Sequence, residues 1–208
     1  MTLKIYGIAR SRAFRALWMA GELGLDYELV TVDFADGGTR RPEFLAINPN
    51  GHVPAIDDGG FRLWESMAIN LYLAKKYSSG EGGLYPQRLE DEARVWQWSF
   101  WGMTEIERPA LVALLNRIGP EDRRDAAAAD AGERDLAAPL RVLDGAVSAS
   151  PYLVDGRFTA ADLNVASILA WARQARVDLS RFPRAAAWLK ACHDRPAAQA
   201  ARQMQRTS

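Results

Sequence analysis

The sequence contains a single cysteine, Cys192, among 208 residues. One cysteine excludes a disulfide within the chain and any cysteine-rich metal site, and it is typical of proteins from a reducing compartment. The chain has only two histidines, and with one cysteine at scattered positions they make no zinc site. Cys192 and His193 are neighbours, so on a helix their side chains would point about 100° apart, which suits a nucleophile and its base poorly.

The chain also lacks an excess of either charge, because Lys plus Arg and Asp plus Glu both number 26. The absence of a basic excess argues against nucleic acid or an anionic membrane as a partner. There is no uninterrupted apolar run of about 18 residues, and the beginning of the chain, MTLKIYG, does not have the pattern of a signal peptide. No glycine-rich phosphate loop follows a predicted strand. We therefore expect a cytoplasmic protein, and its neutral net charge makes self-association plausible.

The first part of the chain alternates between strand and helix patterns. Short β-branched or alternating segments predict strands, and segments with helical spacing predict helices between them. An Asp-Gly-Gly turn separates the last two strands and predicts a hairpin. The expected strands are 3–7, 26–34, 53–57 and 61–64, and the expected helices are 12–24, a short one within 37–51, and 65–77.

Beyond a Ser-, Gly- and Pro-rich segment the composition changes to Ala, Leu and Arg, with few strand signals. A long helix is expected at 88–119, weakened at Pro109, and a second at 121–150 that Pro139 should kink or restart. The fold class is therefore α/β followed by all-α. The expected domains are residues 1–78, a linker at 79–87, and a helical domain at 88–208.

Thr159, followed by Asp162 three residues later, predicts an acidic variant of the capping box at the start of a helix over 159–175. Capping explains both residues fully, so neither is assigned to catalysis. Two short helices, at 182–194 and 196–204, are expected to close the chain.

Ser11 lies within RSRAFR, at the predicted start of the first helix. Free backbone N–H groups and the helix dipole favour an anion there, and the same field lowers the pKa of a thiol from about 8.5. A hydroxyl that donates to sulfur would stabilise the thiolate further. The alternative is an ordinary serine N-cap; since Phe14 would then occupy N3, no reciprocal capping box would form.

Four segments together resemble the cytosolic glutathione S-transferases of the serine type, which are theta- and delta-like with many bacterial members. They are SRAFR, NPNGHVPAI, LWESMAINLYLAKKY and FTAADLNVAS. The resemblance covers nearly the whole chain. It implies a thioredoxin-like domain followed by a helical bundle, a homodimer with a detoxification role, and glutathione as co-substrate without a metal.

The resemblance also implies residue roles. Ser11, four residues before Arg15, matches the catalytic serine of the family, and Val53 and Pro54 would be joined by a cis peptide. The expected glutathione-binding residues are His52, Val53, Pro54, Glu65 and Ser66. Backbone groups of Val53 would pair with the cysteinyl peptide of glutathione.

Each of the other contacts has its own chemical reason. His52 would bind the glycyl carboxylate best when protonated, although an exposed loop histidine is an equally good interpretation. Glu65 would pair with the γ-glutamyl ammonium, and Ser66 would hold the neighbouring carboxylate; helix capping is the alternative for both.

The implied reaction is attack of the glutathione thiolate on an apolar electrophile, near the segment Phe100–Thr104. In the aromatic stretch WQWSFWGM, any single residue, Trp101 included, is more often core than pocket lining. The alternatives are a glutathione-dependent peroxidase, isomerase or dehalogenase, or a non-catalytic binding module. The sequence leaves the roles of Arg10 and Arg12 open.

Overall fold

The computed structural model describes residues 2–78 and 82–207. The contacts within the chain divide it into two compact units. Unit 1 contains the described residues up to Tyr85 together with those from Asp194 onward, and unit 2 runs from Pro86 to His193. Residues 79–81 of the expected linker lie outside the described residues. The sequence analysis did not anticipate that the last helix would pack with the first unit.

Unit 1 is built on a four-stranded sheet with the order β2-β1-β3-β4. β1 pairs in parallel with β2 and antiparallel with β3, and β3 forms the predicted hairpin with β4. The strands are β1 (Leu3–Tyr6), β2 (Tyr27–Val30), β3 (Ala55–Asp58) and β4 (Phe61–Trp64). This mixed sheet, with its parallel β1-α1-β2 crossover, confirms the expected thioredoxin-like fold.

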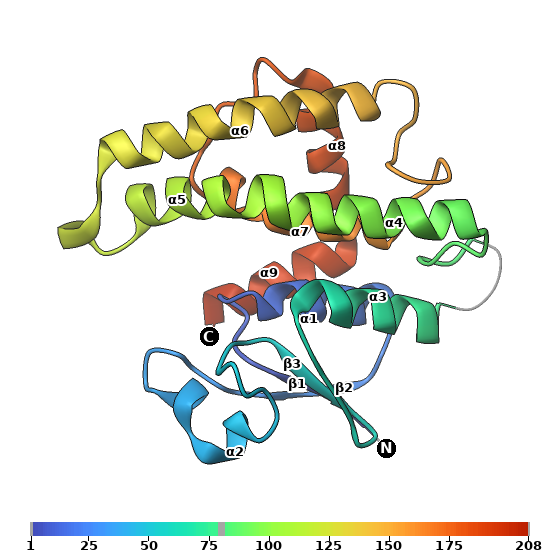
Figure 1. Ribbon diagram of the computed structural model, residues 1–208, viewed down its shortest axis with the longest axis vertical. Helices are drawn as coiled ribbons and strands as arrows, with labels where there is room; N and C mark the ends of the chain where they lie inside the picture. Colours follow the sequence, from blue (N-terminus) through green and yellow to red (C-terminus); the bar gives the residue numbers. More distant parts are fainter. Residues whose placement is uncertain (1, 79–81, 208) are drawn as a thin grey trace. The chain divides into compact units, whose positions relative to one another are not determined.

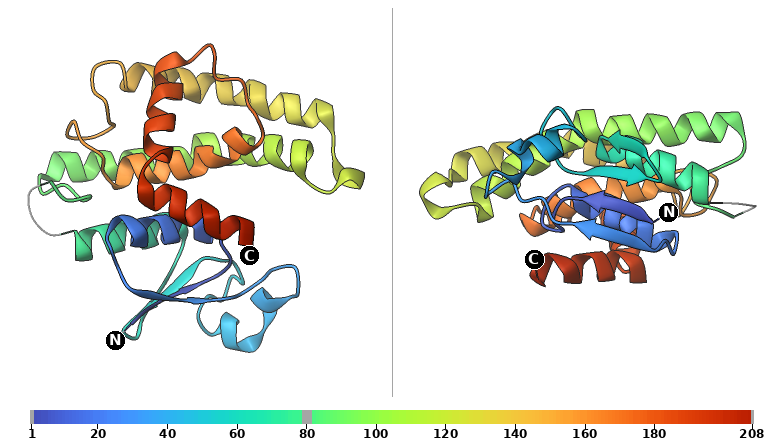
Figure 2. Two further views of the ribbon diagram at one scale, coloured as in Figure 1. Left: turned by 180° about the vertical axis from the view of Figure 1, so that it is seen from behind. Right: turned by 90° about the horizontal axis from the view of Figure 1, so that it is seen from below.

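Helices cover both faces of this sheet, as the ribbon views show (Figures 1 and 2). The first and third helices lie on one face, and a short second helix lies on the other. The bounds are α1 (Ala13–Glu22), the 3-10 turn η1 (Gly38–Arg40), α2 (Pro42–Leu45), α3 (Ser66–Tyr77) and α9 (Pro196–Thr207). Leu3 and Ile5 of β1 are buried, whereas the alternating Lys4 and Tyr6 are partly exposed, so the better-covered face is that of α1 and α3.

The C-terminal helix α9 packs along α1 within unit 1. The contact is close, because a Cβ added to Gly21 would lie 3.2 Å from the Cβ of Ala197. Arg195 makes a bidentate ion pair with Glu22, with both distances 2.7 Å. Trp18 of α1 donates its indole N–H to the same carboxylate. α9 is therefore tied to the helix that begins beside Ser11.

The secondary structure of unit 2 is helical, as expected, apart from one isolated antiparallel bridge between Val154 and Arg157. Its elements are α4 (Leu89–Trp101), the π-helical segment η2 (Gly102–Ile106), α5 (Glu107–Ile118), the 3-10 turn η3 (Glu121–Arg123), α6 (Ala126–Ala146), α7 (Ala160–Gln174) and α8 (Pro183–His193). α6 packs against α5, as Figure 1 shows. α7 is the central helix, with twelve of its residues buried.

The two prolines that were expected to disturb helices act differently. The long helix predicted over 88–119 is interrupted at η2, ahead of Pro109 rather than at it. In a regular α-helix the ring of Pro109 would clash with the carbonyl four residues earlier, that of Glu105. This carbonyl lies in the wider π turn, which accommodates the ring. α6 continues through Pro139 as one helix, so of the two expected outcomes, a kink or a restart, the restart does not occur.

The capping box at the start of α7 is confirmed. Asp162 accepts from the Thr159 backbone N–H at 3.0 Å, and Thr159 bonds the N3 backbone in return. Asp162 also accepts from the Leu153 N–H and from the indole of Trp188. Burial is the leading influence on Asp162 and raises its pKa, against the hydrogen bonds that lower it.

Candidate functional site

Ser11 lies in the tight turn between β1 and α1. Its hydroxyl donates to the carbonyl of Ile8 at 2.7 Å and accepts from the N–H of Ala13 at 3.1 Å. The helix begins at Ala13 with Arg12 as its N-cap residue, so Ser11 precedes the helix by one residue more than an N-cap serine would. The serine still satisfies a free N–H of the first turn, and it is partly exposed.

Gly7 brings this turn against the segment that contains Val53. Its φ is 142°, and a Cβ added there would lie 2.7 Å from the Cβ of Ala13 and 3.3 Å from that of Val53. Only a residue without a side chain fits between them. The start of α1 and Val53 are therefore close neighbours, and the expected cis peptide between Val53 and Pro54 is present.

The turn before Val53 is held by Asn48, which the sequence analysis missed. Asn48 is buried; its amide donates to the carbonyl of His52 at 2.6 Å, and its side-chain oxygen accepts from the N–H of Asn50 at 3.0 Å. The His52 side chain is exposed. An Asn two residues before a second Asn is a recognisable turn signal, so pattern reasoning could have found it.

Arg40 is a second residue that the sequence analysis missed. Its guanidinium lies 3.4 Å from the carbonyl of Asn50 and is exposed. Gly51 follows with a φ of 63°, and a Cβ there would lie 2.8 Å from both the Arg40 guanidinium and the Thr39 carbonyl. The turn therefore places the cation of Arg40 one residue from His52. Nothing in the local pattern of residues 38–41 distinguishes Arg40 from Arg41.

Ser66 begins α3 and is connected to α1 through Arg15. Both side chains are buried, and Arg15 donates to the Ser66 hydroxyl at 3.1 Å. Glu65, directly before the helix, is exposed and has a φ of 73°, which is uncommon for a residue with a side chain. The contact brings the N-terminal turns of α1 and α3 together, and both favour anions.

Arg10, whose role was open, is engaged outside this region. Its guanidinium pairs with Asp33 at 2.5 Å and lies 6.0 Å from the centroid of the Phe34 ring. Arg15, by contrast, places a buried positive charge beside Ser66. Of these two arginines, Arg15 adds positive potential between the two helix starts.

The residues expected near the second substrate lie in unit 2. Phe100 is 61% exposed, and Trp101 packs edge-on against Trp98 with ring centroids 4.9 Å apart. Thr104 lies in η2 and its hydroxyl contacts the carbonyl of Trp101 at 3.4 Å. Gly102 is tightly packed, because a Cβ there would lie 2.9 Å from Ile168. π-helical segments of this kind are frequent at functional sites.

Within residues 2–78 and 82–207, no group of three or more His, Cys, Asp and Glu side chains is placed to hold a metal ion. None of the helices in the same part of the chain is long and apolar enough to cross a membrane.

Family models match both parts of the chain. Residues 1–75 match the N-terminal domain of glutathione S-transferases, and residues 106–196 match their C-terminal domain. Glutathione S-transferase 3 of Zea mays is 35% identical over 95% of this chain and 91% of its own. The chain belongs to the glutathione S-transferase family.

Solved structures support the same assignment. Glutathione transferase F7 from Populus trichocarpa superposes with a TM-score of 0.89 at 27% identity, covering 98% of this chain and 99% of its own. A glutathione S-transferase-I bound with lactoylglutathione has a TM-score of 0.86 at 28% identity, with 98% and 100% covered.

These matches confirm a glutathione transferase that uses glutathione as co-substrate. They do not support the narrower expectation of a theta- or delta-like bacterial subclass, because close relatives are plant enzymes. Glutathione S-transferase F10 of Arabidopsis thaliana, for example, is 33% identical over 78% of this chain and 77% of its own.

Proposed function

We propose that Ser11 is the catalytic residue and that its hydroxyl stabilises the thiolate of bound glutathione. The observation that carries this proposal is the partly exposed hydroxyl at the N-terminal end of α1, bonded to the Ala13 N–H. An acceptor bond from a helix N–H polarises the hydroxyl toward donation. The helix end itself favours the negative sulfur.

In the structure, the proton of Ser11 is directed at the Ile8 carbonyl. Thiolate binding requires the hydroxyl to turn from this carbonyl to the sulfur while it keeps the Ala13 N–H as donor. Because a charged acceptor forms the stronger hydrogen bond, the exchange is favourable. A neutral thiol is a poor acceptor and gains nothing, so the exchange lowers the pKa of the thiol.

The γ-glutamyl end of glutathione is assigned to the start of α3. Glu65 is exposed at the helix entrance and supplies the carboxylate for the ammonium. Ser66, with the free N–H groups of the first turn, supplies donors for the carboxylate. Arg15 orients the Ser66 hydroxyl and adds a buried positive charge behind it.

The remainder of glutathione is assigned to the turn before β3. The Val53 backbone, next to the cis bond to Pro54, pairs with the cysteinyl peptide. The glycyl carboxylate lies near His52, and we add Arg40 as a second cation for it, since it contacts the same turn. All of these residues fall within positions 1–78, the proposed glutathione-binding domain. The proposed linker is 79–87 and the proposed helical domain is 88–208, although the last helix of that range, α9, packs with unit 1.

The second substrate in this proposal is a small apolar electrophile, with Phe100, Trp101 and Thr104 as the residues that accept it. The enzyme is proposed to be a homodimer that acts in the cytoplasm in detoxification. Support comes from the single cysteine, which suits a reducing compartment, and from Trp96 and Phe100, which are large exposed apolar side chains.

Calorimetric titration with glutathione tests the assigned contacts. We expect one molecule to bind per chain, and Ser66→Ala to weaken binding by about tenfold, because a hydrogen bond to a charged group is worth about 1.5–3 kcal/mol. Ser148→Ala, which removes an exposed hydroxyl from unit 2, is the matched control and should bind normally. Binding that Ser66→Ala leaves intact would contradict the γ-glutamyl assignment, and folded protein that does not bind would favour a non-catalytic module.

A further inference from the structure

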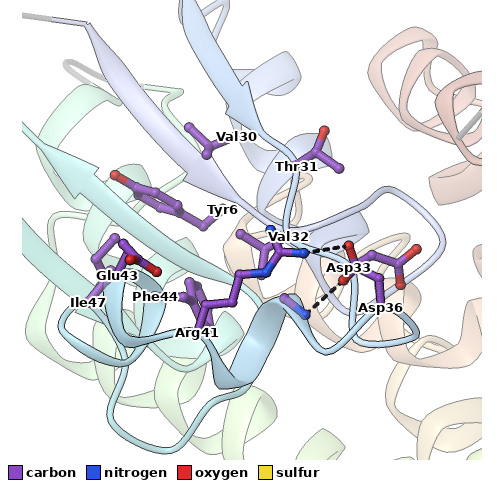
Figure 3. A pocket seen from close by; sticks show the side chains of 11 residues that line it. Tyr6, Val30, Thr31, Val32, Asp33, Asp36, Arg41, Glu43, Phe44 and Ile47 are labelled. Atoms are coloured by element: carbon purple, nitrogen blue, oxygen red, sulfur yellow. Dashed lines mark hydrogen bonds and ion pairs between the residues drawn. The ribbon is translucent and has the colours of Figure 1, made fainter.

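A pocket lies beside α2, on the sheet face opposite α1 and α3. It has a volume of about 370 Å³, within the usual range of small-molecule sites. Its walls come from β1, from β2 and the residues that follow it, and from η1 and α2 (Figure 3). None of the proposed glutathione contacts is among its lining residues. The pocket is therefore distinct from these contacts in its lining, although Val53 packs against the same hydrophobic cluster that forms its floor.

The floor of the pocket is apolar and partly aromatic. Tyr6, Val32, Phe44 and Ile47 form it, and they belong to one hydrophobic cluster. The rings of Tyr6 and Phe44 are tilted against each other with centroids 6.3 Å apart. β2 is an edge strand, so the pocket opens beside a strand that, among the described residues, is paired on one side only. Such a floor suits the hydrocarbon body of a small ligand.

The rim of the pocket has an excess of negative charge. Asp33, Asp36 and Glu43 line it against one cation, Arg41. Asp36 is paired with Arg41 at 3.2 Å, and Asp33 is paired with Arg10, which lies outside the pocket. Figure 3 shows Glu43 on the other side of the pocket from these two aspartates.

Glu43 thus carries the uncompensated charge, since it has no ion-pair partner within residues 2–78 and 82–207. An apolar floor beside such a carboxylate fits a molecule with a hydrocarbon body and a positively charged end. A carboxylate or phosphate ligand would instead meet the unpaired carboxylate of Glu43, on a rim whose one lining cation, Arg41, is already paired with Asp36.

We propose that this pocket is a second ligand-binding site, selective for small arylalkyl amines in their ammonium form. The aryl group lies on Tyr6 and Phe44, and the ammonium group pairs with Glu43. The site does not depend on Ser11 or on glutathione, so it stands or falls separately from the proposed catalytic function.

The test uses 4-phenylbutylamine, with 4-phenylbutanol and 4-phenylbutyrate as neutral and anionic probes of the same body. We expect the amine to bind one site with a Kd on the order of a millimolar or below, as expected for a ligand of this size. It should bind about fivefold more tightly than the alcohol, the effect of one partly exposed ion pair, and the butyrate should bind more weakly than both. Amide resonances of Thr31, Val32 and Gly38 should shift on titration.

Two variants distinguish binding of the amine in the pocket from non-specific binding. Glu43→Gln removes the charge from an exposed position and should weaken amine binding about fivefold while alcohol binding stays unchanged. Glu90→Gln, an exposed carboxylate in unit 2, is the matched control and should behave as the wild type. Saturating glutathione should leave amine affinity unchanged in every variant.

Each of three results would overturn the proposal. One is no saturable binding of the amine by protein that binds glutathione. Another is equal affinity of the amine for the wild type and for Glu43→Gln. The third is displacement of the amine by glutathione, with resonance shifts near Ser11 and Ser66 in place of those around the pocket.

Discussion

Replacing Ser11 with Ala removes the hydroxyl that is proposed to stabilise the thiolate. In the unliganded structure this hydroxyl donates to the Ile8 carbonyl at 2.7 Å, so part of what the thiolate gains is offset by a bond given up. A hydrogen bond to a charged acceptor contributes about 1.5–3 kcal/mol, and a neutral one about 1 kcal/mol. The net stabilisation of the thiolate is therefore about 0.5–2 kcal/mol.

That energy corresponds to a shift of about one unit in the pKa of the bound thiol. In Ser11→Ala the pKa of bound glutathione should rise by about one unit. At a pH below both values, kcat/KM for a reactive aromatic electrophile should fall about tenfold, and the two enzymes should converge as the pH rises above both pKa values. The measurements are the ultraviolet absorbance of the bound thiolate against pH and the pH profile of kcat/KM.

A structural effect must be separated from this catalytic one. Ser11→Ala also removes the acceptor for the Ala13 N–H, which should cost about 1 kcal/mol of stability whatever the pH. Ser11→Thr keeps a hydroxyl and should retain a lowered thiol pKa. If the pKa of glutathione bound to Ser11→Ala equals that of glutathione bound to the wild type, the thiolate is stabilised by other groups and the reasoning fails.

Three further predictions concern the contacts that hold the fold. Arg195→Met should reduce the free energy of unfolding by about 2 kcal/mol, because the side chain of its partner Glu22 is almost completely buried. Lys4→Met, which breaks the exposed pair with Glu28, should reduce it by under about 1 kcal/mol. Urea denaturation measures both losses, and equal losses would contradict the role of burial. Burial works to raise the pKa of Asp58, but hydrogen bonds from Lys76, Tyr77 and Tyr72 outweigh it and hold that pKa below its ordinary value. A carboxyl whose pKa is lowered by folding stabilises the protein above its unfolded pKa of about 3.9, and this stability is lost as the pH falls through the folded pKa. Asp58→Asn should therefore be less stable than the wild type at neutral pH, and the difference in stability between the two proteins should disappear in acid. A constant gap in pH-dependent thermal unfolding would exclude this linkage. Asp162→Ala should lose about 3 kcal/mol or more in denaturant titration, because it leaves buried donors from Leu153, Thr159 and Trp188 without their acceptor; a loss below about 1 kcal/mol would show that these donors find other partners.

Local signals in the sequence were sufficient for most of the secondary structure. Two short strand-like segments around an Asp-Gly-Gly turn predicted the hairpin of β3 and β4, and Thr159 with Asp162 predicted the start of α7. Both depend on residues within a few positions of each other, so the chain itself carries the information. Pro109 was harder, because whether a proline ends a helix or is accommodated by a π turn depends on packing, here around Gly102.

The candidate site was predicted only in part. Ser11 and Ser66 became candidates because each lies at a predicted helix start within a family motif, and Val53 because the resemblance implied its cis bond to Pro54, which is present. Asn48 was missed although its spacing from Asn50 is a local turn signal, whereas Arg40 was missed because its contact with Asn50, ten positions away, forms only once the chain folds.

By itself, the sequence determined the two-part composition, most of the element order and the residue types that suit a thiolate and a peptide ligand. Only the tertiary structure showed that Arg15 donates to Ser66, 51 positions away in the sequence, and that Arg195 pairs with Glu22, 173 positions away. The physical reason is that helix and strand patterns are read within a few residues, whereas a buried ion or hydrogen-bond pair is selected by the packing of distant elements, and no periodicity along the chain encodes which partner lies opposite.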